Sequence, residues 1–238
     1  MTVSLDFTGL EAKRYTLDEQ LGEGGFGTVY AAVNSNDEQV AIKVLDKEKN
    51  STIPGRTGRI PLEKAIMMIL SEPSVCVNVV QMLDWLDLST SYIMVMERPI
   101  PSMDLQQYCE SKGPLLPKSA LKVFKQVVVA CQFCFDRGVY HNDIKLDNIL
   151  INTETFVVKL IDFGLAKKIE TNERNDDILW LGKLLYALLH FPNVVTLHTD
   201  PHFRPVVSEA CRQLILQCLD QNNLPTFMEI LNHECFNE

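Results

Sequence analysis

The stretch Glu97-Arg98-Pro99-Ile100-Pro101 divides the chain into two parts of different character. Two prolines two positions apart exclude a central strand and a helix interior. Before this stretch, from Tyr15 to Asp46, valine, tyrosine and isoleucine alternate with polar residues, which predicts three antiparallel strands. After it, apolar residues recur at spacings of three and four, which predicts helices. We therefore expect an α+β fold with two lobes, a small antiparallel β lobe and a larger, mainly helical lobe.

The first part also contains one predicted helix, over Pro61–Leu70, because proline favours the first turn of a helix. A loop is predicted over residues 50–59, and apolar runs follow at 75–85 and 92–96. The helices predicted in the second part are Leu105–Cys109, Lys118–Asp136, Asp177–His190, Ser208–Leu219 and Thr226–Leu231, with strand-like pieces at Ile149–Asn152 and Val157–Ile161. The predicted organisation is one domain, with residues 1–96 as the N-terminal lobe, 97–101 as a hinge and 102–238 as the C-terminal lobe.

The charge and cysteine content of the chain indicate which partners it can bind and in which cellular compartment we expect it. The 238 residues include 22 Lys and Arg against 31 Asp and Glu, a net charge of −9, which repels nucleic acid and anionic membranes and favours a basic protein substrate. Seven cysteines lie scattered through apolar segments, and Asp6 and Glu11 interrupt any leader peptide. We expect a monomer in the reducing cytoplasm, with the nucleus left open, and neither a nucleic-acid nor a membrane partner.

Leu21-Gly-Glu-Gly-Gly-Phe-Gly-Thr-Val29 places glycines at positions 22, 24 and 27, between two predicted strands. A strand on each side excludes the dinucleotide-binding turn, in which a strand is followed by a helix. Glycines let a backbone fold over a polyphosphate and direct N–H groups at it. Gly22, Gly24 and Gly27 are therefore candidates for phosphate binding, and an ordinary hairpin turn is the alternative.

Val40-Ala-Ile-Lys43 is an apolar strand that ends in a single cation. A carboxylate on the following helix, Glu63, could pair with Lys43 and direct it at the phosphates of a nucleotide. Each residue also has a simpler explanation, because an edge-strand lysine is usually solvated and an acid in the first turn complements the helix dipole. Lys43 and Glu63 are candidates for orienting phosphates.

Tyr140-His-Asn-Asp-Ile-Lys-Leu-Asp-Asn148 and Leu160-Ile-Asp-Phe-Gly164 supply the polar residues of the second part. Asp143 could accept a proton from an attacking hydroxyl, and Lys145 could stabilise a transferring phosphoryl group. Asn148 and Asp162 offer the oxygen ligands that Mg²⁺ prefers. Four such motifs in this order are far more specific than any one of them.

On these residues the chain resembles the eukaryotic protein kinases, and among them the Pim group, to which the double-proline stretch is the most specific match. The resemblance implies a two-lobed fold that binds ATP and Mg²⁺, with Met96 as gatekeeper. It also implies that Asp104 and Asp147 bind arginines of the substrate. Lys145, two residues after Asp143, matches the serine/threonine form of the family's catalytic loop. The nucleotide-binding residues implied are Leu21, Gly22, Gly24, Gly27, Val29, Ala41, Lys43, Met96, Glu97 and Leu150.

The sequence departs from the family pattern within the stretch from Tyr140 to Asn148 and again after Gly164. Asn142 stands where the family has an arginine, so this position has no guanidinium to bind a phosphorylated activation segment. In this chain that segment contains a single hydroxyl-bearing residue, Thr171. Only residues 165–176 separate Gly164 from Asp177, and the glutamate that ends the family's activation segment is missing. Leu224 replaces the arginine that pairs with that glutamate, so both members of a buried ion pair are lost together. Two hypotheses follow: a serine/threonine protein kinase, or a nucleotide-binding pseudokinase that acts as an interaction module.

Overall fold

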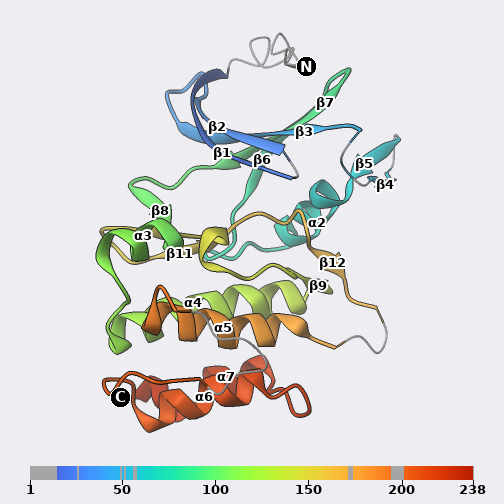
Figure 1. The fold of residues 1–238 in the computed structure, drawn as a ribbon. Helices are drawn as coiled ribbons and strands as arrows, with labels where there is room; N and C mark the ends of the chain where they lie inside the picture. Colours follow the sequence, from blue (N-terminus) through green and yellow to red (C-terminus); the bar gives the residue numbers. More distant parts are fainter. Residues whose placement is uncertain are drawn as a thin grey trace. The chain divides into compact units, whose positions relative to one another are not determined.

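The computed structural model describes residues 15–25, 27–48, 50, 52–55, 58–170, 174–193 and 201–237 (Figure 1). The chain forms two compact units: unit 1 comprises residues 1–75 and 80–100, and unit 2 comprises residues 76–79 and 101–238. Among the residues described, unit 1 holds a five-stranded antiparallel sheet, a short two-stranded hairpin and one helix, and unit 2 is mainly helical. The predicted α+β class is therefore confirmed.

Unit 1 contains a five-stranded sheet whose neighbouring strands are all antiparallel. Its strands, in spatial order, are β1 (Thr16–Gly24), β2 (Gly27–Val33), β3 (Gln39–Asp46), β7 (Ser91–Glu97) and β6 (Met82–Asp87). One face carries an apolar cluster to which β3 contributes Val40, Ile42 and Val44. Because side chains alternate along a strand, Ala41 and Lys43 point to the other face.

A hairpin of β4 (Thr52–Pro54) and β5 (Arg59–Pro61) precedes the helix α2 (Leu62–Ser71). This hairpin corrects the prediction of a loop over residues 50–59. Ile53 pairs with Ile60 across it, so two isolated apolar residues pair although neither lies in an apolar run. The helix begins after Pro61, as the proline predicted, and buries Ile66, Met67 and Leu70.

Unit 2 contains the five predicted helices, with ends that differ by a few residues. They are α3 (Leu105–Lys112), α4 (Pro117–Phe135), α5 (Asp176–His190), α6 (Glu209–Leu219) and α7 (Phe227–Leu231), with 3₁₀ turns η1 (Leu146–Asn148) and η2 (Glu234–Asn237). The helix α5 buries nearly all of its side chains, and it contacts both α4 and α6 (Figure 1). A helix that is apolar on all sides belongs at the centre of a helical unit.

The described part of unit 2 also contains two small sheets. One has the order β11 (Val158–Leu160), β10 (Ile149–Asn152) and β8 (Ser102–Asp104), and the other pairs β9 (Val139–Tyr140) with β12 (Lys167–Lys168). The strand-like pieces predicted after the polar motif are thus β10 and β11. The sequence analysis missed β8, β9 and β12, which are too short to show a period of two.

Residues 76–79 lie in unit 2, which differs from the predicted lobe of residues 1–96. The Asn78 side-chain amide donates to the Val158 carbonyl at 2.8 Å, and the Asn78 carbonyl accepts from the Leu160 N–H at 2.8 Å. These bonds attach the segment to the outer edge of β11. No helix in the described part of the chain combines the length and the hydropathy of a bilayer-spanning segment.

His190 ends α5 and joins it to the segment before α6. The ring is 2% exposed, and its Nε2 accepts the backbone N–H of Arg204 at 3.0 Å. Nδ1 must then carry the proton, and it donates to the Tyr186 carbonyl at 2.9 Å. Burial lowers the pKa of His190 from its ordinary value, and the charges of Arg204, His202 and Arg212 act in the same direction, against the Tyr186 carbonyl. The folded chain therefore favours the neutral ring.

We expect His190→Gln to reduce the loss of stability on acidification. Below the ordinary histidine pKa of about 6.5, the unfolded chain binds a proton that the buried ring resists, so the stabilisation by neutral His190 is lost as the pH falls. The measurement is urea unfolding at pH 7 and pH 5, followed by Trp180 fluorescence in a Trp85→Phe background. His141, which is also buried, is present in both proteins and therefore cancels in the comparison. An equal pH dependence with and without the substitution would contradict the assignment.

Candidate active site

One face of the unit 1 sheet gathers several of the predicted nucleotide residues. Residues directly opposite each other in an antiparallel pair share a face. Lys43 lies opposite Val29 on β2, and Ala41 lies opposite Met96 on β7. Since Ala41 and Lys43 also share a face, these four side chains lie together, on the side away from the apolar cluster. Glu97 lies opposite Val40, and its side chain accepts the Gln81 N–H at 2.9 Å.

Lys43 and Glu63 form a buried ion pair that links β3 to α2. The Lys43 ammonium lies 2.7 and 2.9 Å from the two carboxylate oxygens, and the residues are 4% and 6% exposed. This pairing excludes the solvated lysine considered above, and Glu63 does more than complement the helix dipole. The pair holds Lys43 in one orientation, which a residue that positions phosphates requires.

Gly22, Gly24 and Gly27, at the ends of β1 and β2 that meet in a hairpin, differ in how strictly the fold requires glycine. Gly27 has φ +151°, and a Cβ there would collide with the Val44 carbonyl, so the fold itself requires glycine. A Cβ at Gly22 or Gly24 would meet no atom within 4 Å. The fold thus leaves space beside Gly22 and Gly24, which a ligand approaching the backbone could occupy. Leu21, beside them on β1, is 43% exposed.

In unit 2, Asp177 anchors the backbone of the catalytic motif. Its carboxylate accepts the N–H of His141 at 2.8 Å and the N–H of Asn142 at 2.7 Å. Burial raises the pKa of Asp177, while His141 and the two N–H groups act in the opposite direction. Asn142 has φ +63°, a left-handed conformation in which asparagine is enriched. The first turn of α5 therefore fixes the path of the chain that leads to Asp143.

Asp143, Lys145 and Asn148 form one cluster. The Lys145 ammonium lies 3.0 Å from the Asp143 carboxylate, and the Asn148 amide donates to Asp143 Oδ2 at 2.7 Å and to its carbonyl at 2.8 Å. The hydrogen bond to Asp143 is the main cause that raises the pKa of Lys145, so the ammonium stays charged. The cluster combines a carboxylate that can take a proton with a cation beside it.

Asp162 lies next to this cluster at the end of β11. The Ile161 N–H donates to the Asn148 carbonyl at 2.9 Å, which brings the two motifs together. Asp162 has φ +60°, and one of its carboxylate oxygens accepts the Gly164 N–H at 3.2 Å. Because both N–H groups of the Asn148 amide bind Asp143, its oxygen is the atom that remains for a cation. An amide oxygen and a carboxylate are the ligand types that fit Mg²⁺.

Unit 2 thus brings together Asp143, Lys145, Asn148 and Asp162, and Leu150 lies on β10 directly opposite Asp104. Sequence reasoning missed His141, whose Nε2 lies 2.9 Å from the Ile161 carbonyl and whose Nδ1 accepts the Asp143 N–H at 3.3 Å. The signal for it was its position within the stretch from Tyr140 to Asn148, between an apolar pair and the first polar residues. Thr171 lies outside the described residues.

Comparison with known proteins gives concordant results. The protein kinase domain model matches residues 15–187. The chain is 32% identical to "Serine/threonine-protein kinase pim-2" of Danio rerio over 260 residues, covering 93% of this chain and 84% of that protein. It is 31% identical to "Serine/threonine-protein kinase prk-2" of Caenorhabditis elegans over 258 residues, covering 93% and 58%. It is 34% identical to "CBL-interacting protein kinase 28" of Oryza sativa subsp. japonica over 168 residues, covering 70% and 37%.

Proposed function

Because this chain belongs to the protein kinase family, we propose that it transfers the γ-phosphoryl group of ATP to serine and threonine hydroxyls of proteins. The observation that carries this proposal is the cluster in unit 2, where Lys145 and Asn148 both bind the Asp143 carboxylate. A positioned base with a cation beside it matches what phosphoryl transfer needs from a protein.

In the proposed reaction the substrate hydroxyl oxygen attacks the γ-phosphorus, and the bond from that phosphorus to the β–γ bridging oxygen breaks. ADP leaves, and Asp143 accepts the hydroxyl proton. Lys145 stabilises the negative charge that spreads over the transferring group. Asn148 holds the Asp143 carboxylate in place through its amide N–H.

Unit 1 contributes the groups proposed to bind the nucleotide. Lys43, held by Glu63, binds the α- and β-phosphates, and the backbone at Gly22 and Gly24 lies over them. On the strength of the resemblance, Ala41, Met96 and Glu97 are proposed to contact adenine, and the resemblance assigns the same role to Leu150. The open space beside Gly22 and Gly24 supports this assignment, because the fold alone does not require glycine at either position.

Mg²⁺ is the metal we propose, with Asn148 and Asp162 as its protein ligands. When bound, it would neutralise charge on the β- and γ-phosphates. The chemistry of the two ligands supports the assignment, since both offer hard oxygen atoms.

Asp162→Asn is expected to abolish the part of the ATP-induced stabilisation that depends on Mg²⁺. The substitution removes one negative charge from the proposed metal site while keeping the side chain's shape. Thermal unfolding with ATP, with and without Mg²⁺, measures this, and the exposed Asp136→Asn is the matched control. An unchanged Mg²⁺-dependent shift in Asp162→Asn would show that the metal binds elsewhere.

We propose a preference for basic peptides. Burial is the main cause that raises the pKa of Asp104, the Gln107 N–H acts in the opposite direction, and the charge of Asp147 adds to the rise. Asp104 also caps α3 by accepting the Gln107 N–H at 2.7 Å, so it has a structural role of its own. Two neighbouring carboxylates on a chain of net charge −9 favour an arginine-containing substrate.

The pseudokinase hypothesis rests on one observation, the short segment between Gly164 and Asp177. With so few residues available to form a substrate groove, we expect peptide binding to be weak and the KM for a peptide to be high. The measurement is transfer of radiolabelled phosphate from ATP to a basic peptide. Transfer no greater than that of a variant without the catalytic base, with ATP binding retained, would favour the pseudokinase.

A further inference from the structure

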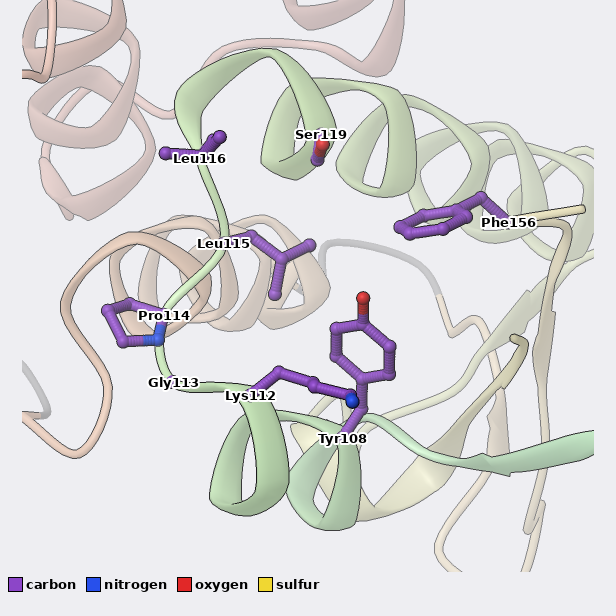
Figure 2. Close-up of a pocket in the computed structure, with 8 residues that line it drawn as sticks. All are labelled: Tyr108, Lys112, Gly113, Pro114, Leu115, Leu116, Ser119 and Phe156. Atoms are coloured by element: carbon purple, nitrogen blue, oxygen red, sulfur yellow. The ribbon is translucent and has the colours of Figure 1, made fainter. Parts of the chain in front are cut away.

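A pocket of about 200 Å³ lies in unit 2, and none of its lining residues belongs to the proposed active site. It is formed by the end of α3, the α3–α4 connection, the first turn of α4 and the turn between β10 and β11 (Figure 2). Its lining combines apolar and aromatic side chains with polar groups in similar measure. Leu115 is buried, while Leu116, at the rim, is 70% exposed.

Two aromatic rings form one side of the pocket. Tyr108 and Phe156 meet edge to face with ring centroids 6.0 Å apart. Figure 2 shows the Tyr108 hydroxyl directed into the pocket, and Ser119 adds a second hydroxyl group to the lining. The pocket therefore offers apolar and aromatic surface for an apolar side chain, together with hydroxyl groups that can form hydrogen bonds with a ligand.

The backbone holds both sides of the pocket in place. Phe156 has φ +60°, which is unfavourable for an aromatic residue, and it persists because its N–H binds the Asn152 carbonyl and its carbonyl accepts the Gln126 amide, both at 2.9 Å. On the opposite side, the Leu115 N–H donates to the Leu188 carbonyl of α5 at 2.8 Å. A pocket whose walls are already positioned loses little entropy when it binds a ligand.

Two lysines lie at the pocket, although acidic residues outnumber basic ones over the full sequence. Lys112 belongs to the lining, and residues 112–125 contain no acidic residue. The Lys122 ammonium lies 5.8 Å from the centroid of the Phe156 ring, beside the pocket wall. Glu110 lies two residues before Lys112, so it is about 200° away around α3 and on the opposite face of that helix. There its carboxylate accepts a hydrogen bond from the Gln106 amide. Glu154, in the β10–β11 turn, is the nearest acidic residue in the sequence to Phe156.

We propose that this pocket docks an acidic peptide segment of a partner protein, which inserts one large apolar side chain. The volume is below the roughly 300–1,000 Å³ typical of small-molecule sites and suits a single leucine, methionine or phenylalanine. Acidic residues on either side of that anchor would meet the ammonium groups of Lys112 and Lys122. A buried anchor surrounded by polar contacts is the usual arrangement of an interface hot spot. The proposal does not depend on phosphoryl transfer.

The test is fluorescence anisotropy with the full chain and a fluorescein-labelled peptide in which one phenylalanine is flanked on both sides by aspartates and glutamates. We expect saturable binding, weakened at least about fivefold when alanine replaces the phenylalanine or lysines replace the acidic residues. Equal binding of the three peptides, or no saturable binding, would overturn the proposal.

Two variants with matched controls locate the binding. Leu116→Ser and Lys112→Glu are each expected to raise the Kd about three- to tenfold. Leu216→Ser and Lys168→Glu make the same changes at exposed positions elsewhere in unit 2 and are expected to change the Kd less than about twofold. Because Leu116 and Lys112 are exposed, their replacement leaves the core intact. A control variant that weakens binding as much as its partner would place the peptide elsewhere on the surface.

Discussion

Asp143→Asn is expected to lower kcat for phosphoryl transfer to a basic peptide by about 10²- to 10⁴-fold. The asparagine keeps the shape of the side chain but cannot accept the hydroxyl proton. The substitution also replaces the charged Asp143 carboxylate with a neutral amide. In the wild-type chain that carboxylate lies 3.0 Å from the Lys145 ammonium and 2.7 Å from the Asn148 amide nitrogen. Nucleotide binding is expected to persist, since Lys43 and Asp162 are unchanged.

Steady-state transfer from radiolabelled ATP, measured over a range of peptide concentrations, separates kcat from KM. Thermal unfolding with ATP and Mg²⁺ provides the control, because it reports binding without chemistry. The kinase hypothesis fails if the wild-type protein and Asp143→Asn give the same background transfer across a broad set of peptides while both bind ATP. The pseudokinase then replaces it.

Lys43→Met is expected to destabilise unit 1 by about 3–5 kcal/mol, because it leaves the Glu63 carboxylate buried without its partner. The double variant Lys43→Met, Glu63→Leu is expected to lose much less, since an apolar pair carries no such penalty. Both members of the pair are almost fully buried, which is why the effect exceeds that of a surface pair. Lys43→Met is also expected to weaken catalysis, through loss of the proposed phosphate contact.

The measurement is urea unfolding of the full chain in a Trp180→Phe background, which leaves Trp85 on β6 as the one tryptophan and hence a reporter of unit 1. Lys47→Met is the matched control, because Lys47 pairs with Asp87 at the surface of the same unit. We expect this substitution to lower the free energy of unfolding by only about 1 kcal/mol. If Lys43→Met and the double variant were equally destabilised, the loss would come from packing rather than from the unpaired carboxylate.

Local patterns in the sequence were sufficient for most of the elements. Helices such as α4 and α5 show apolar residues every three or four positions over many turns, so their existence did not depend on distant contacts. The strands β8, β9 and β12 have no such pattern. Each forms only because a partner strand lies alongside, and the partner of β8 is β10, far along the chain.

For the active site, the sequence by itself determined the residue types and their order: the glycines, Lys43, the stretch from Tyr140 to Asn148, and Asp162. Those motifs are short runs whose chemistry depends on the side chains themselves.

Tertiary structure decided which groups meet. Glu63 could have served only the helix dipole, and the fold instead places it on Lys43. Asp177 is one of two acids at the start of α5, and only packing shows that it receives the N–H groups of His141 and Asn142. The pocket beside Tyr108 likewise draws on segments far apart in the chain. Periodicity and motif spacing act over a few residues, whereas these contacts depend on how distant segments pack, which no local pattern encodes.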